Sequence, residues 1–386
     1  MWKILHKHRP WPIGLAIAAD GVRMLQLRPV GSRLAVVAGA QWLRGQGDVG
    51  LLDALDEARR EGNFEGRHVV SSISSDEIHI RSIRLPDMTR DELHATISAK
   101  AHDLFGFDIA LSQIQILGSA PVLNGDESTR ETILLALPNF ALHRRRELLA
   151  KVALRDVATE PEPVAMFRGF HRLLRRDSDR MSINALVDVG PSSTMVLVAQ
   201  GPDIIFVKKI DRGGQHLTKA AAEQLGLNIT DAQELRQQLK IDLLERTRNM
   251  GQVQPIPQGR DNGSDFFWSV HDAVRSEADA LVLEVGLCLR YCSTTFGCEA
   301  IDKITLAGQE AWDPSLLHLL AERLGVRCEV AQPFRNLDVS CSRIFRDRRG
   351  MLADWTACIG LASWGEFDRQ AEVLHGSPGL SHEGAR

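Results

Sequence analysis

Short runs of alternating apolar and small residues near the N-terminus indicate β-strands joined by tight turns. Residues 13–17 alternate between the two faces of a strand, and the turn after them holds the dipeptide Asp20-Gly21, which favours hairpins. Residues 22–27 and 34–38 continue the pattern as a second and a third strand. The start of the chain is therefore expected to form three strands of an antiparallel sheet.

The same succession of three strands and two turns occurs again in the second half of the chain. A strand at 185–189 is followed by a turn at 190–193, a strand at 194–199, a turn at 200–203 and a strand at 204–210. Helical sequence follows each copy. Two copies this far apart do not have the short, uniform period of a solenoid, so they predict two related lobes.

Helical and strand patterns alternate through the rest of the chain, which indicates a mixed α/β fold. In the first lobe, helices are predicted at 51–60, from the Thr89/Glu92 capping box to about 104, and at 140–153, with strands at 69–73, 78–85, 113–117 and 133–137. In the second lobe, helices are predicted at 215–225, after Thr230, and at 267–296, 314–324 and 351–364, with a strand at 303–307. The polar tail at 370–386 is predicted to be disordered.

Composition and charge narrow the functional classes. The 386 residues are 44% hydrophobic and 25% charged, which is typical of globular domains. The net charge of −4 argues against a nucleic-acid binder that relies on bulk positive charge. No apolar run approaches 18 residues, so we expect neither a membrane span nor a signal peptide.

Three further patterns have simple structural explanations. The six cysteines form no CxxC pair, which favours reduced structural thiols over zinc or disulfides. Residues 45–50 match GxGxxG, but no buried hydrophobic strand precedes them, so glycine-rich loop composition explains them better than a dinucleotide site. The arginines at 144–146 suit a solvated helix face, with an acidic partner or a lipid surface as the alternative.

The second copy of the strand pattern carries the strongest candidate chemistry. Asp188 lies at the end of a predicted strand, where a carboxylate can hold Mg²⁺ through water. The turn after it holds Gly190, Ser192, Ser193 and Thr194, whose amides and hydroxyls can point at phosphate oxygens. An ordinary polar hairpin is the alternative explanation.

Two glycine sites downstream could belong to the same binding site. Gly213 and Gly214 open a predicted helix, and the amides of a helix N-terminus bind anions. Gly308 follows the predicted strand at 303–307, and a glycine at the carboxyl end of a strand lets a ligand approach the backbone. Each signal is weak alone, because glycine more often simply makes a turn.

Taken together, the order of these motifs resembles the actin-like ATPase superfamily, and within it the PilM-like proteins of type IV pilus assembly. The resemblance covers residues 13–364 and is stronger in the second lobe, where it rests on residues 185–190, 204–210, 213–226, 304–308 and 356–362. In the first lobe, residues 83–86 and the helix after Glu92 resemble the subdomain typical of PilM-like proteins.

The resemblance implies a duplicated, two-lobed α/β fold of the actin-like (ribonuclease H-like) type with an inserted α+β subdomain. The first lobe would span residues 1–165, with the insertion at about 66–160, and the second lobe would span 181–369. It also implies ATP and Mg²⁺ as ligands, bound by the residues Asp188, Gly190, Ser192, Ser193, Thr194, Gly213, Gly214 and Gly308, with Asp188 nearest the metal.

The function that the resemblance implies is a cytoplasmic scaffold, held at the inner membrane by other subunits of a pilus or secretion platform. In PilM-like proteins a groove in the first lobe holds the short cytoplasmic N-terminal segment of a PilN-like membrane protein. A groove beside residues 69–85 would suit an extended peptide added to a strand edge. No nucleic acid is expected as a partner.

Departures from the family pattern predict an incomplete nucleotide site. Ala16 and Ala18 stand where relatives carry Asp and Gly, and Arg23 stands in place of a lysine. Gln309 replaces the second of two paired glycines, and Gln233 an acidic residue. Hydrolysis is therefore expected to be weak or absent. The alternatives are an ATPase or small-molecule kinase of the same fold, or an FtsA-like filament protein, although the tail at 376–384 cannot form the amphipathic helix of FtsA-like proteins.

Overall fold

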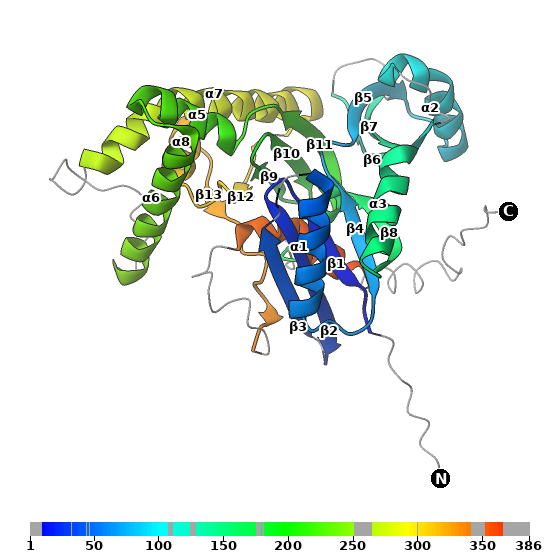
Figure 1. Ribbon diagram of the computed structural model, residues 1–386. Helices are drawn as coiled ribbons and strands as arrows, with labels where there is room; N and C mark the ends of the chain where they lie inside the picture. The colour runs from blue at the N-terminus through cyan, green and yellow to red at the C-terminus, as the bar shows by residue number, and fades with distance from the viewer. Residues whose placement is uncertain are drawn as a thin grey trace, which may run out of the picture.

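A computed structural model of the chain describes residues 10–31, 33–43, 45, 47–106, 111–123, 129–174, 179, 181–250, 265–298, 300–340 and 352–365. The predicted disordered tail at 370–386 lies outside these residues. Two sheets, each with helices packed on it, form the body of the molecule, and a smaller three-stranded sheet stands at one side (Figure 1). Within the described residues, no helix is long and apolar enough to cross a membrane.

The first lobe is built on a six-stranded sheet of order β14-β3-β2-β1-β4-β8. The strands β1, β2 and β3 are antiparallel, whereas β4 runs parallel to β1 and β8 runs parallel to β4. The strands are β1 (Ile13–Ile17), β2 (Gly21–Val30), β3 (Arg33–Leu43), β4 (His68–Ile73), β8 (Arg155–Pro161) and β14 (Leu337–Asp338).

The alternation of side chains along β1 explains how this sheet is covered on both faces. Ile13, Leu15 and Ile17 lie in the core cluster that also contains the buried residues of helices α1 (Gly47–Glu61) and α3 (Asn139–Lys151). Gly14 faces the other way, where a side chain would collide with the backbone of α9 (Thr356–Ala362). Helix α9 packs there together with α4 (Glu162–His171).

The second lobe repeats the arrangement of strands. Its sheet has the order β11-β10-β9-β12-β13, again with three antiparallel strands followed by two parallel ones. The strands are β9 (Ile183–Val189), β10 (Thr194–Gln200), β11 (Asp203–Ile210), β12 (Lys303–Ala307) and β13 (Cys328–Val330). The helices are α5 (Gly214–Leu225), α6 (Ile229–Met250), α7 (Asp265–Phe296) and α8 (Pro314–Leu324). The predicted duplication is thus confirmed by the topology of the two sheets.

Within the predicted insertion at about 66–160, two kinds of segment are present. The separate sheet, of order β5-β7-β6, consists of β5 (His79–Pro86), β6 (Ser112–Pro121) and β7 (Thr129–Pro138), with helix α2 (Arg90–Phe105) packed against it. The flanking strands β4 and β8 pair within the first-lobe sheet instead. The segment that forms a sheet of its own therefore runs from β5 to β7.

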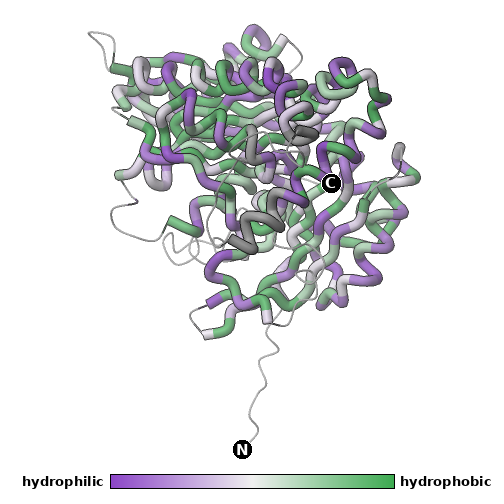
Figure 2. The backbone as a smooth tube through the Cα atoms, turned by 90° about the vertical axis from the view of Figure 1, so that its left-hand side faces the viewer, coloured by the Kyte–Doolittle hydropathy of each residue, from purple (hydrophilic) through white to green (hydrophobic). Residues whose placement is uncertain are grey.

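Segments from the end of the chain also return to the first lobe. Strand β14 pairs with β3, and helix α9 packs on β1, although both fall inside the predicted second lobe at 181–369. A short 3₁₀ turn (Ala353–Trp355) precedes α9 and carries the fully buried Trp355. The interior strands of both lobes are largely apolar, whereas the outer helices mix apolar and polar positions (Figure 2). The two lobes therefore share a continuous core around the C-terminal segment.

Candidate functional site

The turns that end the first strand of each copy face each other across a cleft between the lobes. Five of the predicted ligand-binding residues line this cleft, namely Asp188, Gly190, Ser192, Ser193 and Gly308. From the first lobe it is lined by Ala16, Ala18 and Ala19 of the β1–β2 hairpin. The cavity has a volume of about 90 Å³. Pockets for small-molecule ligands usually measure about 300–1,000 Å³, so a nucleotide would require the lobes to move apart.

Two carboxylates meet at the base of the cleft. Burial raises the pKa of Asp188 to about 7, and the negative charge of Glu162 adds to the effect. Burial also raises the pKa of Glu162, although the N–H and O–H groups of Ser75 donate to its Oε2 at 2.8 and 2.7 Å. Both shifts favour the protonated acids, because burial in a low-dielectric site and a neighbouring carboxylate each oppose ionisation.

Arg23 occupies the position that the resemblance gives to a lysine, but it forms ion pairs with two carboxylates of the chain itself. Only 2% of the residue is exposed. Its Nη2 donates to Asp20 at 2.7 Å and to Asp354 at 2.6 Å. Burial alone would lower the pKa of Arg23, but the two carboxylates outweigh it and raise the pKa. Arg23 therefore joins the hairpin to the C-terminal segment rather than presenting a free cation to the cleft.

Three of the predicted ligand-binding residues do not line the cleft. Thr194 is buried, and its hydroxyl donates to the carbonyl oxygen of Arg212 at 2.7 Å. A side chain on Gly213 would place its Cβ 2.5 Å from the carbonyl oxygen of Gly190. A side chain on Gly214 would collide with the carboxylate of Glu310. In this structure the two glycines permit close packing behind the cleft.

Gly308 needs glycine for two reasons. Its φ of +86° lies in the left-handed region, which residues with a Cβ rarely adopt. An added Cβ would lie 2.5 Å from the carbonyl oxygen of Val189 and 2.9 Å from Oδ1 of Asp188. The backbone at Gly308 thus packs directly on the end of β9, where Asp188 is held.

A cluster of buried charges behind Gly214 was not predicted from the sequence. Arg236, on α6, donates to Oε2 of Glu310 at 2.8 Å and to Oδ2 of Asp313 at 3.3 Å, and it also reaches the carbonyl oxygen of Gly214 at 3.0 Å. Lys240 pairs with the same oxygen of Glu310. Burial alone would raise the pKa of Glu310, but Lys240 and Arg236 outweigh it and lower the pKa to about 2. The cluster ties α5 and α6 to the loop after Gly308.

Other residues at the cleft were also missed by sequence reasoning. Glu162 and Asp354 line the cleft beside Asp188, and Asp76 crosses it to contact Lys209 and Ser192 of the second lobe. The one local feature that could have located Glu162 is the pair of prolines on either side of it. Proline is well tolerated in the first turn of a helix, so these prolines mark the start of α4. Asp76 lies in a loop and Asp354 in the 3₁₀ turn before α9, and neither has a distinctive spacing in the sequence.

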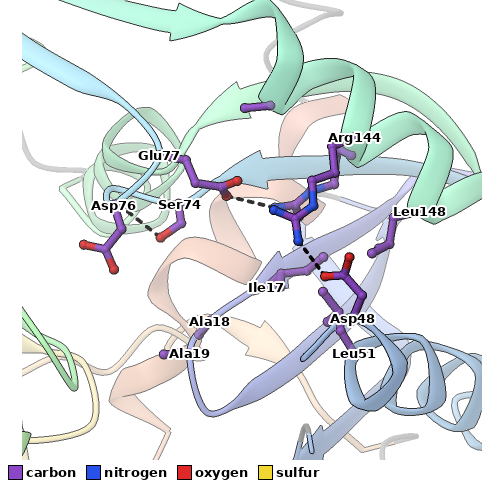
Figure 3. Close-up of a pocket in the computed structure, with 12 residues that line it drawn as sticks. Ile17, Ala18, Ala19, Asp48, Leu51, Ser74, Asp76, Glu77, Arg144 and Leu148 are labelled. Atoms are coloured by element: carbon purple, nitrogen blue, oxygen red, sulfur yellow. Dashed lines mark hydrogen bonds and ion pairs between the residues drawn. The ribbon is translucent and has the colours of Figure 1, made fainter. Parts of the chain in front are cut away.

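A second cavity lies in the first lobe, between α1 and α3 (Figure 3). We call it the α1–α3 groove. Its volume is about 310 Å³, which is within the range of ligand pockets. Apolar side chains and the β1–β2 turn line its floor, and charged side chains stand around it. The lining residues are Ile17, Ala18, Ala19, Asp48, Leu51, Ser74, Asp76, Glu77, Ala141, Arg144, Arg145 and Leu148.

Two ion pairs cross the α1–α3 groove. Arg144 Nη2 lies 2.6 Å from Asp48 Oδ1, and this pair joins α3 to the first turn of α1 (Figure 3). Arg145 Nη2 lies 3.6 Å from Glu77 Oε2. Arg144 and Asp48 are largely exposed, whereas Arg145 is buried. The mouth of the groove is thus bridged by an exposed ion pair, whereas the second pair involves a buried arginine.

The predicted groove beside residues 69–85 agrees only in part with this geometry. The groove borders residues 74–77, which follow β4. Strand β4 itself pairs with β1 on one side and with β8 on the other, so it has no free edge for an added strand. Strand β5 pairs with β7 alone among the described strands. Strand β5 therefore keeps an edge on which an extended peptide could pair, whereas a peptide in the α1–α3 groove would contact side chains of α1 and α3.

Comparison with known proteins identifies the fold. No family model matches this sequence. A chain of the "PilM-PilN type IV pilus biogenesis complex" superposes with a TM-score of 0.72 at 20% identity, covering 92% of this chain and 99% of that one. The ethanolamine utilization protein EutJ from Carboxydothermus hydrogenoformans gives 0.49 at 13% identity (92% and 89% covered). MreB5 of Spiroplasma citri bound to ADP gives 0.46 at 10% identity (95% and 99% covered).

The superposition on the pilus protein spans both lobes and the three-stranded sheet, because it covers nearly all of each chain. The resemblance read from the sequence is thereby confirmed at the level of the fold. This chain has the duplicated, two-lobed actin-like fold in the form found in the PilM–PilN complex.

Proposed function

We propose that this chain is a PilM-like scaffold on the cytoplasmic side of a type IV pilus or type II secretion-like assembly. In this role it binds the short cytoplasmic N-terminal segment of a PilN-like membrane protein, and that partner and other platform subunits hold it at the inner membrane. The fold likeness to a chain of a PilM–PilN complex supports the assignment. The observation that carries it is the α1–α3 groove, whose size suits a few side chains of a peptide.

The groove has the anatomy of a peptide-binding surface. Its floor is apolar, and the exposed side chains of Val49 on α1 (72% exposed) and Phe140 on α3 (70% exposed) carry apolar surface beyond the groove on the two helices that form it. The Arg144–Asp48 pair supplies a polar rim. An apolar centre with a polar rim is the usual arrangement of a protein interface, and it suits a short segment rich in aliphatic residues.

The test measures binding of a synthetic peptide with the sequence of the N-terminal segment of the organism's PilN-like protein. Calorimetry with the full chain should show one-to-one binding. Arg144→Glu places a second negative charge beside Asp48 and should weaken binding about tenfold or more, which corresponds to about 1.4 kcal/mol. Lys151→Glu is the matched control, because Lys151 is an exposed residue of the same helix and does not line the groove. A folded wild-type chain that does not bind the peptide would overturn the proposal.

The interlobe cleft supports a second, weaker role as a nucleotide site without turnover. Asp188, Ser192, Ser193 and Gly308 line it, so carboxylate, hydroxyl and backbone groups are available to Mg²⁺ and phosphate. Among the described residues no group of three or more His, Cys, Asp or Glu side chains could hold a metal. Magnesium would therefore be held by Asp188, water and the phosphates of the nucleotide, which is the arrangement this ion prefers.

The substitutions in the first-lobe hairpin oppose catalysis. Ala16 and Ala18 offer no carboxylate or hydroxyl to the cleft, and Arg23 is bound to Asp20 and Asp354. A thermal shift with Mg-ATP, followed by phosphate release on the same sample, tests this role. A ligand at 100 times its Kd adds about 2.7 kcal/mol to the unfolding free energy. We expect a shift that Asp188→Asn abolishes, without phosphate release. Steady phosphate release would instead support the alternative of an ATPase or kinase.

A further inference from the structure

The four residues after β4 form a loop, the 74–77 loop, that lies between the two cavities. Ser74 and Asp76 line the α1–α3 groove and the interlobe cleft alike. Ala18 and Ala19 of the β1–β2 turn also line both. The two cavities are therefore separated by a wall that is only one loop and one turn thick, and a displacement of the loop changes both at once.

On the side of the cleft, the loop is bonded to the second lobe and to the carboxylate beside Asp188. Asp76 pairs with Nζ of Lys209 and accepts a hydrogen bond of 3.4 Å from Oγ of Ser192. Ser75 donates both its N–H and its O–H to Glu162. Asp76 is thus a direct contact between the first lobe and the turn that holds Ser192.

On the side of the groove, Glu77 is the loop residue with an ion pair to α3 among the described residues. Its carboxylate lies 3.6 Å from Nη2 of Arg145, which is longer than a direct hydrogen bond. Atom Nη1 of Arg145 is buried and has no hydrogen-bond partner among the described residues. An acceptor oxygen brought near by a peptide would bond to Nη1, because buried donors favour a full set of partners, and its negative charge would weaken the long pair between Nη2 and Glu77.

The bonds that Asp76 makes across the cleft are individually weak. Half of the Asp76 side chain is exposed, and ion pairs exposed to this extent are weak. The bond from Ser192 is long. By contrast, the three-stranded sheet is held to the second lobe by Glu131, whose carboxylate accepts a hydrogen bond of 2.6 Å from Tyr291 on α7. Movement of the 74–77 loop can therefore release Asp76 while the sheet stays attached.

We propose that the 74–77 loop couples the α1–α3 groove to the interlobe cleft, so that a peptide bound in the groove releases Asp76 from Lys209 and Ser192 and loosens the cleft. This inference rests on the proposed function, because it takes the groove to be a peptide site. By linkage, anything that holds the cleft closed weakens peptide binding by the same factor, and we expect about fivefold, near the lower end of measured couplings.

Hydrogen–deuterium exchange on the full chain, with and without the synthetic PilN-like segment, tests the coupling without any nucleotide. Peptide binding should slow exchange in α1 and α3 and speed it in residues 190–194 and 206–210 across the cleft. In Asp76→Ala these second-lobe segments should exchange fast already without peptide, and the peptide should bind about fivefold more tightly than to the wild type.

Asp211→Ala is the matched control. Asp211 also lies near Lys209, at 3.9 Å, but both residues belong to the second lobe, so this change removes an equal charge without touching the contact across the cleft. It should behave like the wild type. No slowing in α1 and α3 would mean that the proposed docking fails. Slower exchange in α1 and α3 with unchanged exchange in the second-lobe segments would overturn the coupling but not the docking. Faster exchange in the second-lobe segments on peptide binding to Asp76→Ala would overturn the role of the 74–77 loop.

Discussion

Atom Oδ2 of Asp354 lies 2.6 Å from Nη2 and 3.0 Å from Nε of Arg23, a residue 331 positions earlier in the chain. The two-point contact joins the first hairpin of the first lobe to the turn that begins the C-terminal helix α9. Helix α9 packs on β1 and contributes residues to the core that the two lobes share. The Arg23–Asp354 pair therefore fastens the C-terminal segment to the first hairpin.

Removing one side of this pair should destabilise the protein strongly. Asp354→Ala leaves the buried guanidinium of Arg23 with Asp20 alone, and breaking a buried pair costs about 3–5 kcal/mol. We expect about 2–4 kcal/mol, because Asp20 remains. Urea unfolding followed by circular dichroism measures the change. Asp87→Ala, an exposed acidic residue after β5, is the control, and equal midpoints for the two variants would contradict the prediction.

The stability of the wild type should fall between pH 4 and pH 7 because of Asp188. Folding raises the pKa of this acid from 3.8 to about 7, so in this window the folded state holds a proton that the unfolded state has lost. The stabilisation is complete below the lower value and is lost as the pH rises through the higher one.

Asp188→Asn removes this ionisation, so the variant does not lose unfolding free energy in this window. The unfolding free energy of the variant minus that of the wild type should therefore increase as the pH rises from 4 to 7. Thermal unfolding at pH 5, 6, 7 and 8 measures the difference. Above about pH 7 the difference should become constant. A difference that does not change with pH would show that Asp188 ionises normally in the folded chain.

The buried charge cluster on α6 should show the opposite pH dependence. The pKa of Glu310 is lowered from 4.5 to about 2, so its stabilisation is present above pH 4.5 and is lost as the pH falls toward 2. Glu310→Gln should cost about 3 kcal/mol at pH 7, because Arg236 and Lys240 lose their shared partner. The difference in unfolding free energy between this variant and the wild type, measured by urea unfolding, should decrease below pH 4.5. Glu322→Gln, on the exposed face of α8, is the control and should have little effect, because its ion pair with His318 is exposed to solvent.

Gly308→Ala should destabilise the second lobe by more than backbone strain alone. The left-handed conformation costs an L-residue about 1–2 kcal/mol, and the added Cβ would also press on Val189 and Asp188. Gly226→Ala is the matched control, since its φ of +67° carries the same strain but nothing lies within 4 Å of the added atom. Differential scanning calorimetry of both variants separates strain from contact. Equal decreases in melting temperature for the two variants would mean that the loop at residue 308 moves away from the added Cβ without a cost in free energy.

Local sequence patterns were sufficient to predict the two lobes. The alternation in residues 13–17 and again in 185–189 depends only on near neighbours, and each copy is followed by a turn rich in small residues. These local rules therefore predicted both three-stranded units and the position of Asp188 at a strand end. The same reasoning placed Gly213 and Gly214 in the site, where in the structure they pack against Gly190 and Glu310.

The sequence by itself therefore determined the duplicated fold and five of the residues that line the cleft, because strand alternation and turn chemistry act over a few residues. Only the tertiary structure decided that Arg23 is paired with Asp354, that burial and the nearby Glu162 raise the pKa of Asp188, and that α1 and α3 enclose a groove. These features depend on distances between side chains far apart in the chain, and those distances are set by the packing of the elements against one another and not by any local pattern.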